Sequence, residues 1–296
     1  MRHVPTGRAP WALGPRALEP DTMTPTELRD SLRRVDVAGY PELSTRSRDE
    51  IYGHGDQLSP GGLFLATEMA RRLRLREGGR VLDVGCGFGE SSMFLAETFG
   101  VDVVAVDLWV PPTTLARRIE ARGLATRVTP LQLDVTKPLP FADNYFDAIF
   151  SMTTFHHFAD DDGVAPRLLR TLKSGGRAAI SDTCFNEEIA AAEVPPVFKV
   201  TPAGNIFDTW TAETSTYHSP GWWRRRFEQV GCGRITECDE LEIGPAMWED
   251  KLAYDLERAS WDANKIDQMR WKIDQILYGR AQSPYFTFFL ATLEKP

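Results

Sequence analysis

Short apolar runs alternate with amphipathic stretches through the middle of the chain, and this alternation predicts the fold. Strand-length apolar runs lie at 81–84, 101–107, 128–133, 146–151 and 177–182. Segments of helical period separate them, near 90–97, 113–122 and 164–172, and Ser174-Gly175-Gly176 is expected to end the last helix. Strands that alternate with helices in this way indicate a parallel sheet with helices on both faces.

The last third of the chain extends this sheet but interrupts the alternation twice. Residues 184–219, rich in aromatic and β-branched residues, are expected to form a cap, and a helix follows over 220–230. Two further strands, 234–243 and 285–293, bring the expected total to seven strands. The insertion 247–279 between them has one apolar face with Trp248, Leu252, Leu256 and Ala259, and another with Ile266, Met269, Ile273, Ile276 and Leu277.

Two apolar faces on one insertion must be buried, since large exposed apolar patches usually mark an interface. We therefore expect one face of 247–279 to pack on the domain and the other to cover a binding site, or else to contact a second subunit in a homodimer. At the other end of the chain, residues 1–25 read as a disordered leader rich in Pro, Arg and Gly. Residues 26–79, with helical patterns at 26–35 and 63–75, are expected to form a helical cover before the domain at 80–296.

Composition narrows the classes of partner. The formal net charge of −8 argues against a nucleic-acid partner. The sequence has no apolar run of about 18 residues and no signal-peptide core, so we predict a cytoplasmic protein without a membrane span. The four cysteines form no C-x-x-C pair, so free buried thiols are favoured over a metal site that uses Cys232 and Cys238.

The most informative motif is Val-Leu-Asp-Val-Gly-Cys-Gly-Phe-Gly at 81–89. An apolar strand ends in a turn with three glycines at alternate positions, where a ligand can lie against bare backbone. The spacing D-x-G-x-G-x-G differs from the dinucleotide pattern G-x-G-x-x-G. It resembles the nucleoside-binding loop of class I S-adenosylmethionine-dependent methyltransferases. Leu-Pro-Phe-Ala-Asp-Asn-Tyr-Phe-Asp at 139–147 resembles a second segment of these enzymes, and the resemblance covers about residues 81–182.

The resemblance implies a Rossmann-like, doubly wound, mostly parallel α/β sheet and S-adenosyl-L-methionine as the cofactor. It places Asp107 at the ribose hydroxyls, with Leu108 beside the adenine, and Asp134 at the adenine amino group. The alternative is that both acids are ordinary strand-end or turn residues. The complete set of expected cofactor residues is Asp83, Gly85, Cys86, Gly87, Gly89, Asp107, Leu108, Asp134, Val135 and Ser151.

The acceptor side is less well defined. His156 and His157 follow the fourth strand and are candidate general bases, of which at most one is expected to face the pocket. The alternative is that both only form local hydrogen bonds. Because the sulfonium methyl is already activated, no metal is expected. The candidate acceptor-binding residues are Tyr52, His54, Trp210, Tyr217 and His218.

The function predicted from the sequence is methyl transfer to a small-molecule acceptor, such as a metabolite or natural product. Two rival interpretations are an NAD-dependent oxidoreductase and a non-catalytic nucleoside-binding regulator. A nucleic-acid or protein methyltransferase is a third, but no Asn-Pro-Pro-Tyr-type segment follows the fourth strand, where the chain reads Ser151-Met152-Thr153-Thr154.

Overall fold

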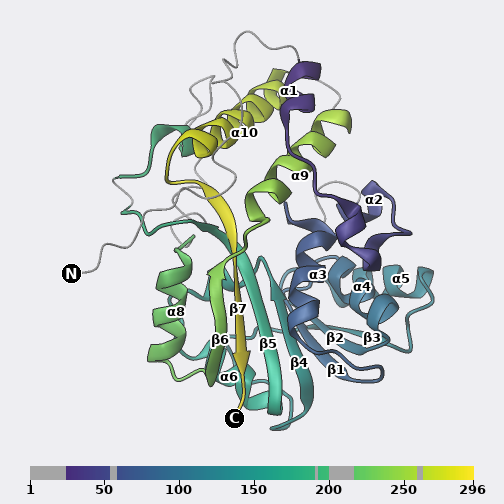
Figure 1. Ribbon diagram of the computed structural model, residues 1–296. Helices are drawn as coiled ribbons and strands as arrows, with labels where there is room; N and C mark the ends of the chain where they lie inside the picture. Colours follow the sequence, from purple (N-terminus) through teal and green to yellow (C-terminus); the bar gives the residue numbers. More distant parts are fainter. Residues whose placement is uncertain (1–24, 54–58, 191–192, 200–216, 259–262) are drawn as a thin grey trace.

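One sheet organises the protein (Figure 1). The computed structural model describes residues 25–53, 59–190, 193–199, 217–258 and 263–296. Its seven strands lie in the order β3-β2-β1-β4-β5-β7-β6, and β7 is antiparallel to both neighbours while the other pairs are parallel. This confirms the predicted fold class. The strands are β1 Arg80–Val84, β2 Asp102–Asp107, β3 Val128–Gln132, β4 Phe146–Met152, β5 Leu172–Phe185, β6 Arg234–Glu240 and β7 Phe286–Glu294.

The prediction for residues 174–176 was wrong in one respect. The preceding helix, α6 Val164–Thr171, ends before them, and β5 begins at Leu172, five residues earlier than expected. The register between β4 and β5 shifts between Phe146 and Ala148, and Gly175 has φ of +73°. Glycine tolerates this backbone conformation, so the glycine pair lets a strand bend where we expected it to end a helix.

Helices cover both faces of the sheet. Alternate residues of the strands point to opposite faces, so Val81 packs with α3 Gly62–Arg72, α4 Glu90–Phe99 and α5 Pro112–Ala121. Leu82 packs on the other face with α6 and with α8 Pro220–Gln229. The resulting two-sided core fixes the strand ends that carry the functional loops.

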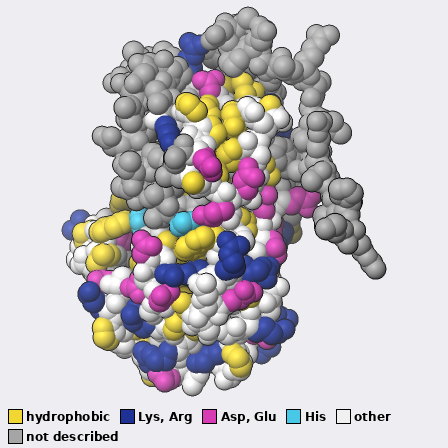
Figure 2. All heavy atoms as spheres, turned by 90° about the vertical axis from the view of Figure 1, so that its left-hand side faces the viewer, with side chains coloured by type: hydrophobic (Ala, Val, Ile, Leu, Met, Phe, Trp, Pro, Cys, Tyr) yellow, Lys and Arg dark blue, Asp and Glu magenta, His cyan; other side chains and the backbone are white. Residues whose placement is uncertain are grey.

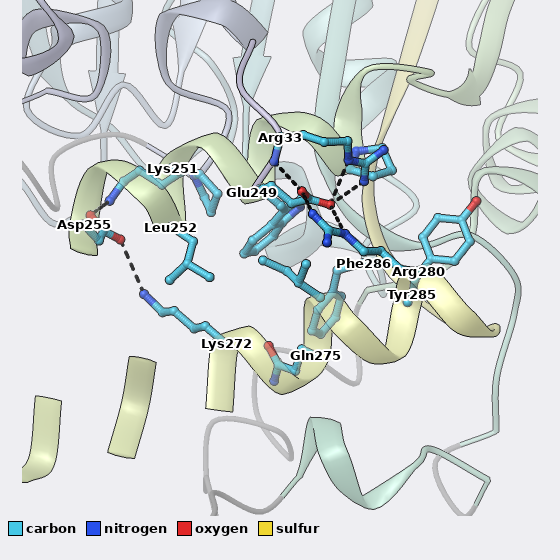
Figure 3. A pocket seen from close by; sticks show the side chains of 15 residues that line it. Arg33, Glu249, Lys251, Leu252, Asp255, Lys272, Gln275, Arg280, Tyr285 and Phe286 are labelled. Carbon is cyan, nitrogen blue, oxygen red and sulfur yellow. Dashed lines mark hydrogen bonds and ion pairs between the residues drawn. The ribbon is translucent and has the colours of Figure 1, made fainter. Parts of the chain in front are cut away.

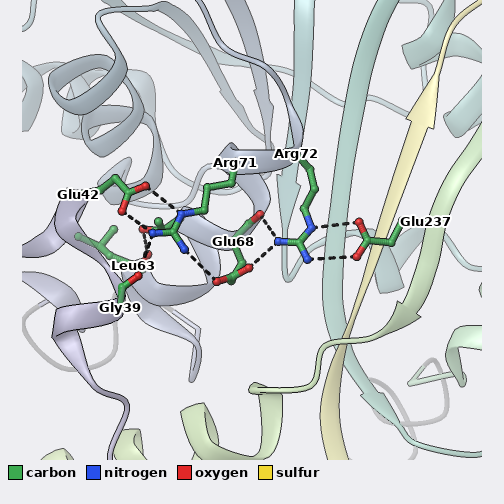
Figure 4. Close-up of polar contacts among 8 residues, drawn as sticks. Gly39, Glu42, Leu63, Glu68, Arg71, Arg72 and Glu237 are labelled. Carbon is green, nitrogen blue, oxygen red and sulfur yellow. Dashed lines mark hydrogen bonds and ion pairs between the residues drawn. The ribbon is translucent and has the colours of Figure 1, made fainter.

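The N-terminal segment comprises α1 Pro25–Ser31, two short 3-10 turns at Val37–Gly39 and Pro41–Leu43, and α2 Arg48–Ile51. The second 3-10 turn and α2 lie against α3, whereas α1 contacts the later helix α9 Gly244–Arg258. Figure 4 shows how α3 is fastened on both sides by adjacent arginines. Arg71 forms an ion pair with Glu42 of this segment at 2.7 Å, while Arg72 donates to Glu237 of β6 at 3.0 Å. Glu68 pairs with both arginines.

The insertion between the last two strands consists of α9 Gly244–Arg258 and α10 Ala263–Ala281. Trp248 stacks on Phe286 and Phe288 of β7, with ring centroids 5.7 Å apart in each case. The two apolar faces largely bury one another, in a cluster that contains Leu32, Leu252, Leu256, Ile273, Met269, Ile276 and Leu277. Ala259 and the side chain of Ile266 lie outside the described residues.

Buried charges fasten α9 to the N-terminal segment. Glu249, 1% exposed, accepts from Arg33 at 2.9 Å and also pairs with Arg280 of α10. Asp250, fully buried, accepts from Arg48 and from the Tyr52 hydroxyl, both at 2.7 Å. Helices α9 and α10 and the N-terminal segment are thus held together by ion pairs as well as by apolar contacts. None of the described helices is long and apolar enough to cross a membrane.

Candidate functional site

A cavity of about 410 Å³ lies at the carboxyl ends of β1, β2 and β4. Ligands bind at this edge in open α/β sheets. Seven of the ten expected cofactor residues line it, namely Gly85, Cys86, Gly87, Asp107, Leu108, Asp134 and Val135. Asp83, Gly89 and Ser151 do not line the cavity.

Asp107 joins the loop after β1 to the loop after β2. One carboxylate oxygen accepts the Gly87 N–H at 2.9 Å, and the other accepts the N–H groups of Trp109 and Val110 at 2.8 and 2.9 Å. Leu108 and Trp109, at the rim, are 47% and 71% exposed. Large apolar side chains beside a cavity suit the flat face of a ligand ring.

The three glycines of the loop are there for different reasons. A Cβ on Gly85 would lie 2.2 Å from the Thr154 side chain, and one on Gly89 would lie 2.2 Å from Leu115. A Cβ on Gly87 would meet no atom within 4 Å. Gly85 and Gly89 therefore allow close packing of the loop, whereas Gly87 leaves open space at the cavity wall.

Asp83 braces the same loop from behind. It is buried and accepts hydrogen bonds from the hydroxyls of Ser91, at 2.8 Å, and Ser92, at 2.5 Å. Burial raises the pKa of this carboxyl to about 6, although the hydrogen bonds from the two serines act to lower it. Ser151 is also structural, because its hydroxyl donates to the Val84 carbonyl at 3.1 Å.

Asp134 and Cys86 differ in electrostatic character. The Asp134 carboxylate accepts from the Thr136 hydroxyl and N–H, at 2.6 and 2.9 Å, and these bonds lower its pKa. It therefore stays ionised and can accept from a ligand amino group. Burial raises the pKa of the Cys86 thiol, so this cysteine is a small apolar wall residue and not a thiolate nucleophile.

The two histidines lie side by side in a 3-10 turn, Phe155–Phe158, directly after β4. Their ring centroids are 3.9 Å apart. His157 lines the cavity and contacts Trp109 edge to face at 5.2 Å. His156 does not line it; it is buried, and its Nδ1 lies 2.9 Å from Asp182 Oδ1.

Asp182 is a site residue that the sequence reasoning missed. It is fully buried in β5, and its second oxygen accepts the backbone N–H of His156 at 3.0 Å. The sequence did contain a signal, because Asp182 ends a predicted strand as Asp107 does. Among the described residues, no group of three or more His, Cys, Asp or Glu side chains could hold a metal ion.

The candidate acceptor residues are dispersed. Tyr52 does not reach the cavity, because its ring is buried and its hydroxyl donates to Asp250. His218 is stacked on Trp222 at 3.7 Å, and its Nδ1 lies 2.7 Å from Glu188. Tyr217 contacts the His156 ring edge to face at 5.3 Å and does not line the cavity. His54 and Trp210 lie outside the described residues.

Comparison with known proteins identifies the central region. Residues 82–180 match a family model described as a methyltransferase domain. Phosphoethanolamine N-methyltransferase 3 of Arabidopsis thaliana is 37% identical over 152 residues, which cover 51% of this chain and 30% of that protein. Methyltransferase GfsG of Streptomyces halstedii is 35% identical over 143 residues, 47% of this chain and 51% of that protein. The chain thus spans about half or less of the length of these relatives.

Two solved structures share the fold over most of this chain. Phosphoethanolamine N-methyltransferase 2 of Haemonchus contortus, in complex with S-adenosyl-L-methionine, has a TM-score of 0.63 at 22% identity, covering 91% of this chain and 60% of that one. The 4+2 cyclase SpnF has a TM-score of 0.56 at 21% identity, covering 79% and 81%. At these identities the likeness concerns the fold, which hosts more than one chemistry.

Proposed function

Because this chain carries a class I S-adenosylmethionine-dependent methyltransferase domain, we propose that it transfers the methyl group of that cofactor to a small-molecule acceptor. The observation that carries the proposal is the cavity that the glycine loop and Asp107 form together. The open space at Gly87 suits a cofactor that lies against the backbone, and Asp107 and Asp134 supply acceptors for ribose hydroxyls and an adenine amino group.

The cofactor supplies an activated methyl group, so the protein has to position the acceptor and exclude water. The Asp107 carboxylate already accepts three N–H groups on about four lone-pair sites. A ribose that donates two hydroxyls must therefore displace one of those N–H groups. Trp109 and Leu108 are exposed at the rim of the cavity, where a bound ligand can pack against them.

The acceptor must lose a proton if its nucleophile is a hydroxyl or a protonated amine, and His157 is the residue we assign to this step. It lines the cavity, and a histidine accepts protons near neutral pH. Asp182 fixes the His156 ring, and that ring packs against His157. In this proposal His156 and Asp182 are positioning residues, and His157 contacts the acceptor.

The surface and the cysteines support the predicted partners and compartment. On the face shown in Figure 2, Lys and Arg side chains are interspersed with Asp and Glu, which does not suit a nucleic-acid phosphate backbone. The four cysteines are buried and free, as in proteins of a reducing compartment, and we propose a cytoplasmic location.

Calorimetry and a turnover assay test the proposal together. S-adenosylhomocysteine should bind and NADH should not, and labelled methyl groups from S-adenosylmethionine should appear in a product when metabolites are screened. In that assay His157→Ala should lower turnover by about 10²–10⁴ with unchanged S-adenosylhomocysteine affinity. His218→Ala is the matched control. Binding without turnover would favour the nucleoside-binding regulator, and NADH binding alone would favour the oxidoreductase.

A further inference from the structure

A second cavity, of about 240 Å³, lies between α9, α10 and the beginning of β7 (Figure 3). It is separate from the cavity at the glycine loop, and no step proposed above uses it. Its wall is apolar where Trp248, Leu252, Ile276 and Phe286 meet. Charged side chains line much of the remainder, together with Gln275 and Tyr285.

The charges on this wall do not balance. Arg33 and Arg280 both pair with Glu249, with Arg33 at 2.5 Å. Lys251 and Lys272 share another, Asp255, with Lys272 at 3.7 Å. Four cations and two carboxylates thus line the cavity among the described residues. On the side where two ammonium groups share the Asp255 carboxylate, the local excess of positive charge favours an anionic ligand.

The position of this cavity connects it to the cofactor site. Pro60 lines the second cavity, and its neighbour Ser59 lines the first. Phe286 pairs with Phe185, the last residue of β5, so both cavities lie at the same edge of the sheet. The Ser59-Pro60 segment thus borders both cavities, and a molecule that reaches from the second cavity to the cofactor would pass this segment.

We propose that the cavity between α9 and α10 binds the methyl acceptor, and that this acceptor has an apolar body and an anionic group, a carboxylate or a phosphate monoester. The apolar wall takes the body, and the Lys251 and Lys272 side of the cavity takes the anion. The identification of the ligand as the methyl acceptor rests on the proposed methyl transfer. The binding of a ligand with an apolar body and an anionic group rests on the cavity alone.

Binding of simple probes tests the ligand class without any turnover. Calorimetry would compare 4-phenylbutanoate and 4-phenylbutyl phosphate with neutral 4-phenylbutanol and cationic 4-phenylbutylamine. We expect one or both anions to bind at least about tenfold more tightly than the other two, and the tighter anion identifies the acid group. Equal affinity for all four probes, or preference for the cation, would overturn the proposal.

Two mild variants assign the effect to this cavity. Lys272→Gln removes a half-exposed charge, and Gln275→Glu adds a carboxylate of the same shape. Each variant should weaken binding of the preferred anion by about three- to tenfold. Lys173→Gln, which removes a similarly exposed lysine paired with Asp147 at the opposite sheet edge, should not. Unchanged anion affinity in both cavity variants would refute the assignment.

The acceptor assignment is tested with a substrate from the labelled-methyl screen. Lys272→Gln and Gln275→Glu should raise its KM and leave kcat and the affinity for S-adenosylhomocysteine close to wild type. An unchanged KM, with weakened anion binding, would show that the cavity holds a different ligand. Failure of the wild type to bind S-adenosylhomocysteine would instead contradict the proposed function, whatever the anion probes do.

Discussion

His156 Nδ1 lies 2.9 Å from Asp182 Oδ1, both side chains are buried, and the His156 ring contacts the ring of His157. A carboxylate that accepts from one ring nitrogen selects the tautomer and fixes the ring. The pair thus gives His157 a rigid neighbour beside the cavity.

Asp182→Asn tests this positioning role. The amide keeps the size of the side chain but loses the charge that orients His156, so kcat should fall by about tenfold to a hundredfold. The pH profile of kcat should shift as well, which a purely structural role would not produce. Asp239→Asn, on the exposed surface of β6, serves as the control. An unshifted profile with wild-type kcat would remove Asp182 from the mechanism.

Asp107→Ala tests the junction between the two cofactor loops. Loss of the carboxylate releases the N–H groups of Gly87, Trp109 and Val110 together with the expected ribose contact. We expect the Kd for S-adenosylhomocysteine to rise at least about tenfold in calorimetry. Asp102→Ala, at the exposed opposite end of the same strand, should leave the Kd unchanged. Similar affinities of the two variants would contradict the assignment.

Comparing Gly87→Val with Gly123→Val distinguishes the loss of space in the cavity from the strain of a positive φ. Gly87 and Gly123 both have positive φ, +52° and +70°, and an added Cβ meets no atom within 4 Å at either position. Only Gly87 lines the cavity. Valine at either position should therefore cost similar stability, about 1–2 kcal/mol in urea unfolding, but only Gly87→Val should nearly abolish S-adenosylhomocysteine binding. If Gly123→Val lost the ligand equally, strain alone would explain the effect.

Asp83 should destabilise the protein as the pH rises. Its folded pKa of about 6 exceeds the ordinary value, so the folded state binds more protons than the unfolded state between about pH 4 and 6. This contribution is therefore unfavourable above pH 6, by up to roughly 3 kcal/mol. Relative to wild type, Asp83→Asn should gain stability on going from pH 4.5 to 7.5 in urea unfolding. A constant difference across this range would show that the carboxyl titrates normally.

The contribution of Glu249 to stability should have the opposite pH dependence to that of Asp83, and Glu249→Gln tests this. Burial favours the neutral acid, but Arg280 and Arg33 hold the pKa of this carboxyl below its ordinary value. Its stabilising contribution is present above the ordinary pKa and is lost as the pH falls through the folded value. At pH 7 the variant should lose about 2–4 kcal/mol, because two arginines lose their shared anion. Glu257→Gln, an exposed partner of Arg34, should lose under about 1 kcal/mol.

Local patterns predicted the central sheet well. The strand end at Asp107 and the glycine loop between β1 and α4 depend on residues that are neighbours in the sequence, and β3 ends at Gln132, one residue before its predicted end. The boundary of β5 was wrong because the glycines at 175 and 176 are compatible with both a helix end and a bent strand.

Contacts between residues far apart in the chain could not be predicted from local sequence patterns. Tyr52 was expected at the acceptor, but its hydroxyl donates to Asp250, 198 residues away. One apolar face of the insertion was expected to pack on the domain and the other to cover a site or a subunit, but the packing of the two faces against each other was not expected. Periodicity indicates which face of a helix is apolar; it does not indicate which other face covers it.

The attachment of the N-terminal segment to α9 also limits when contacts between them can form during translation. Arg33 pairs with Glu249, which is synthesised 216 residues later, and Arg48 pairs with Asp250 after an interval of 202 residues. Until those residues leave the ribosome, Arg33 and Arg48 have no carboxylate from α9 to pair with, although β1 to β5 can already pair. The contacts of Arg33 and Arg48 with α9 are therefore among the last to form, although the same segment can meet α3 earlier. The second cavity, which Arg33 lines together with α9 and α10, is completed only after these contacts form.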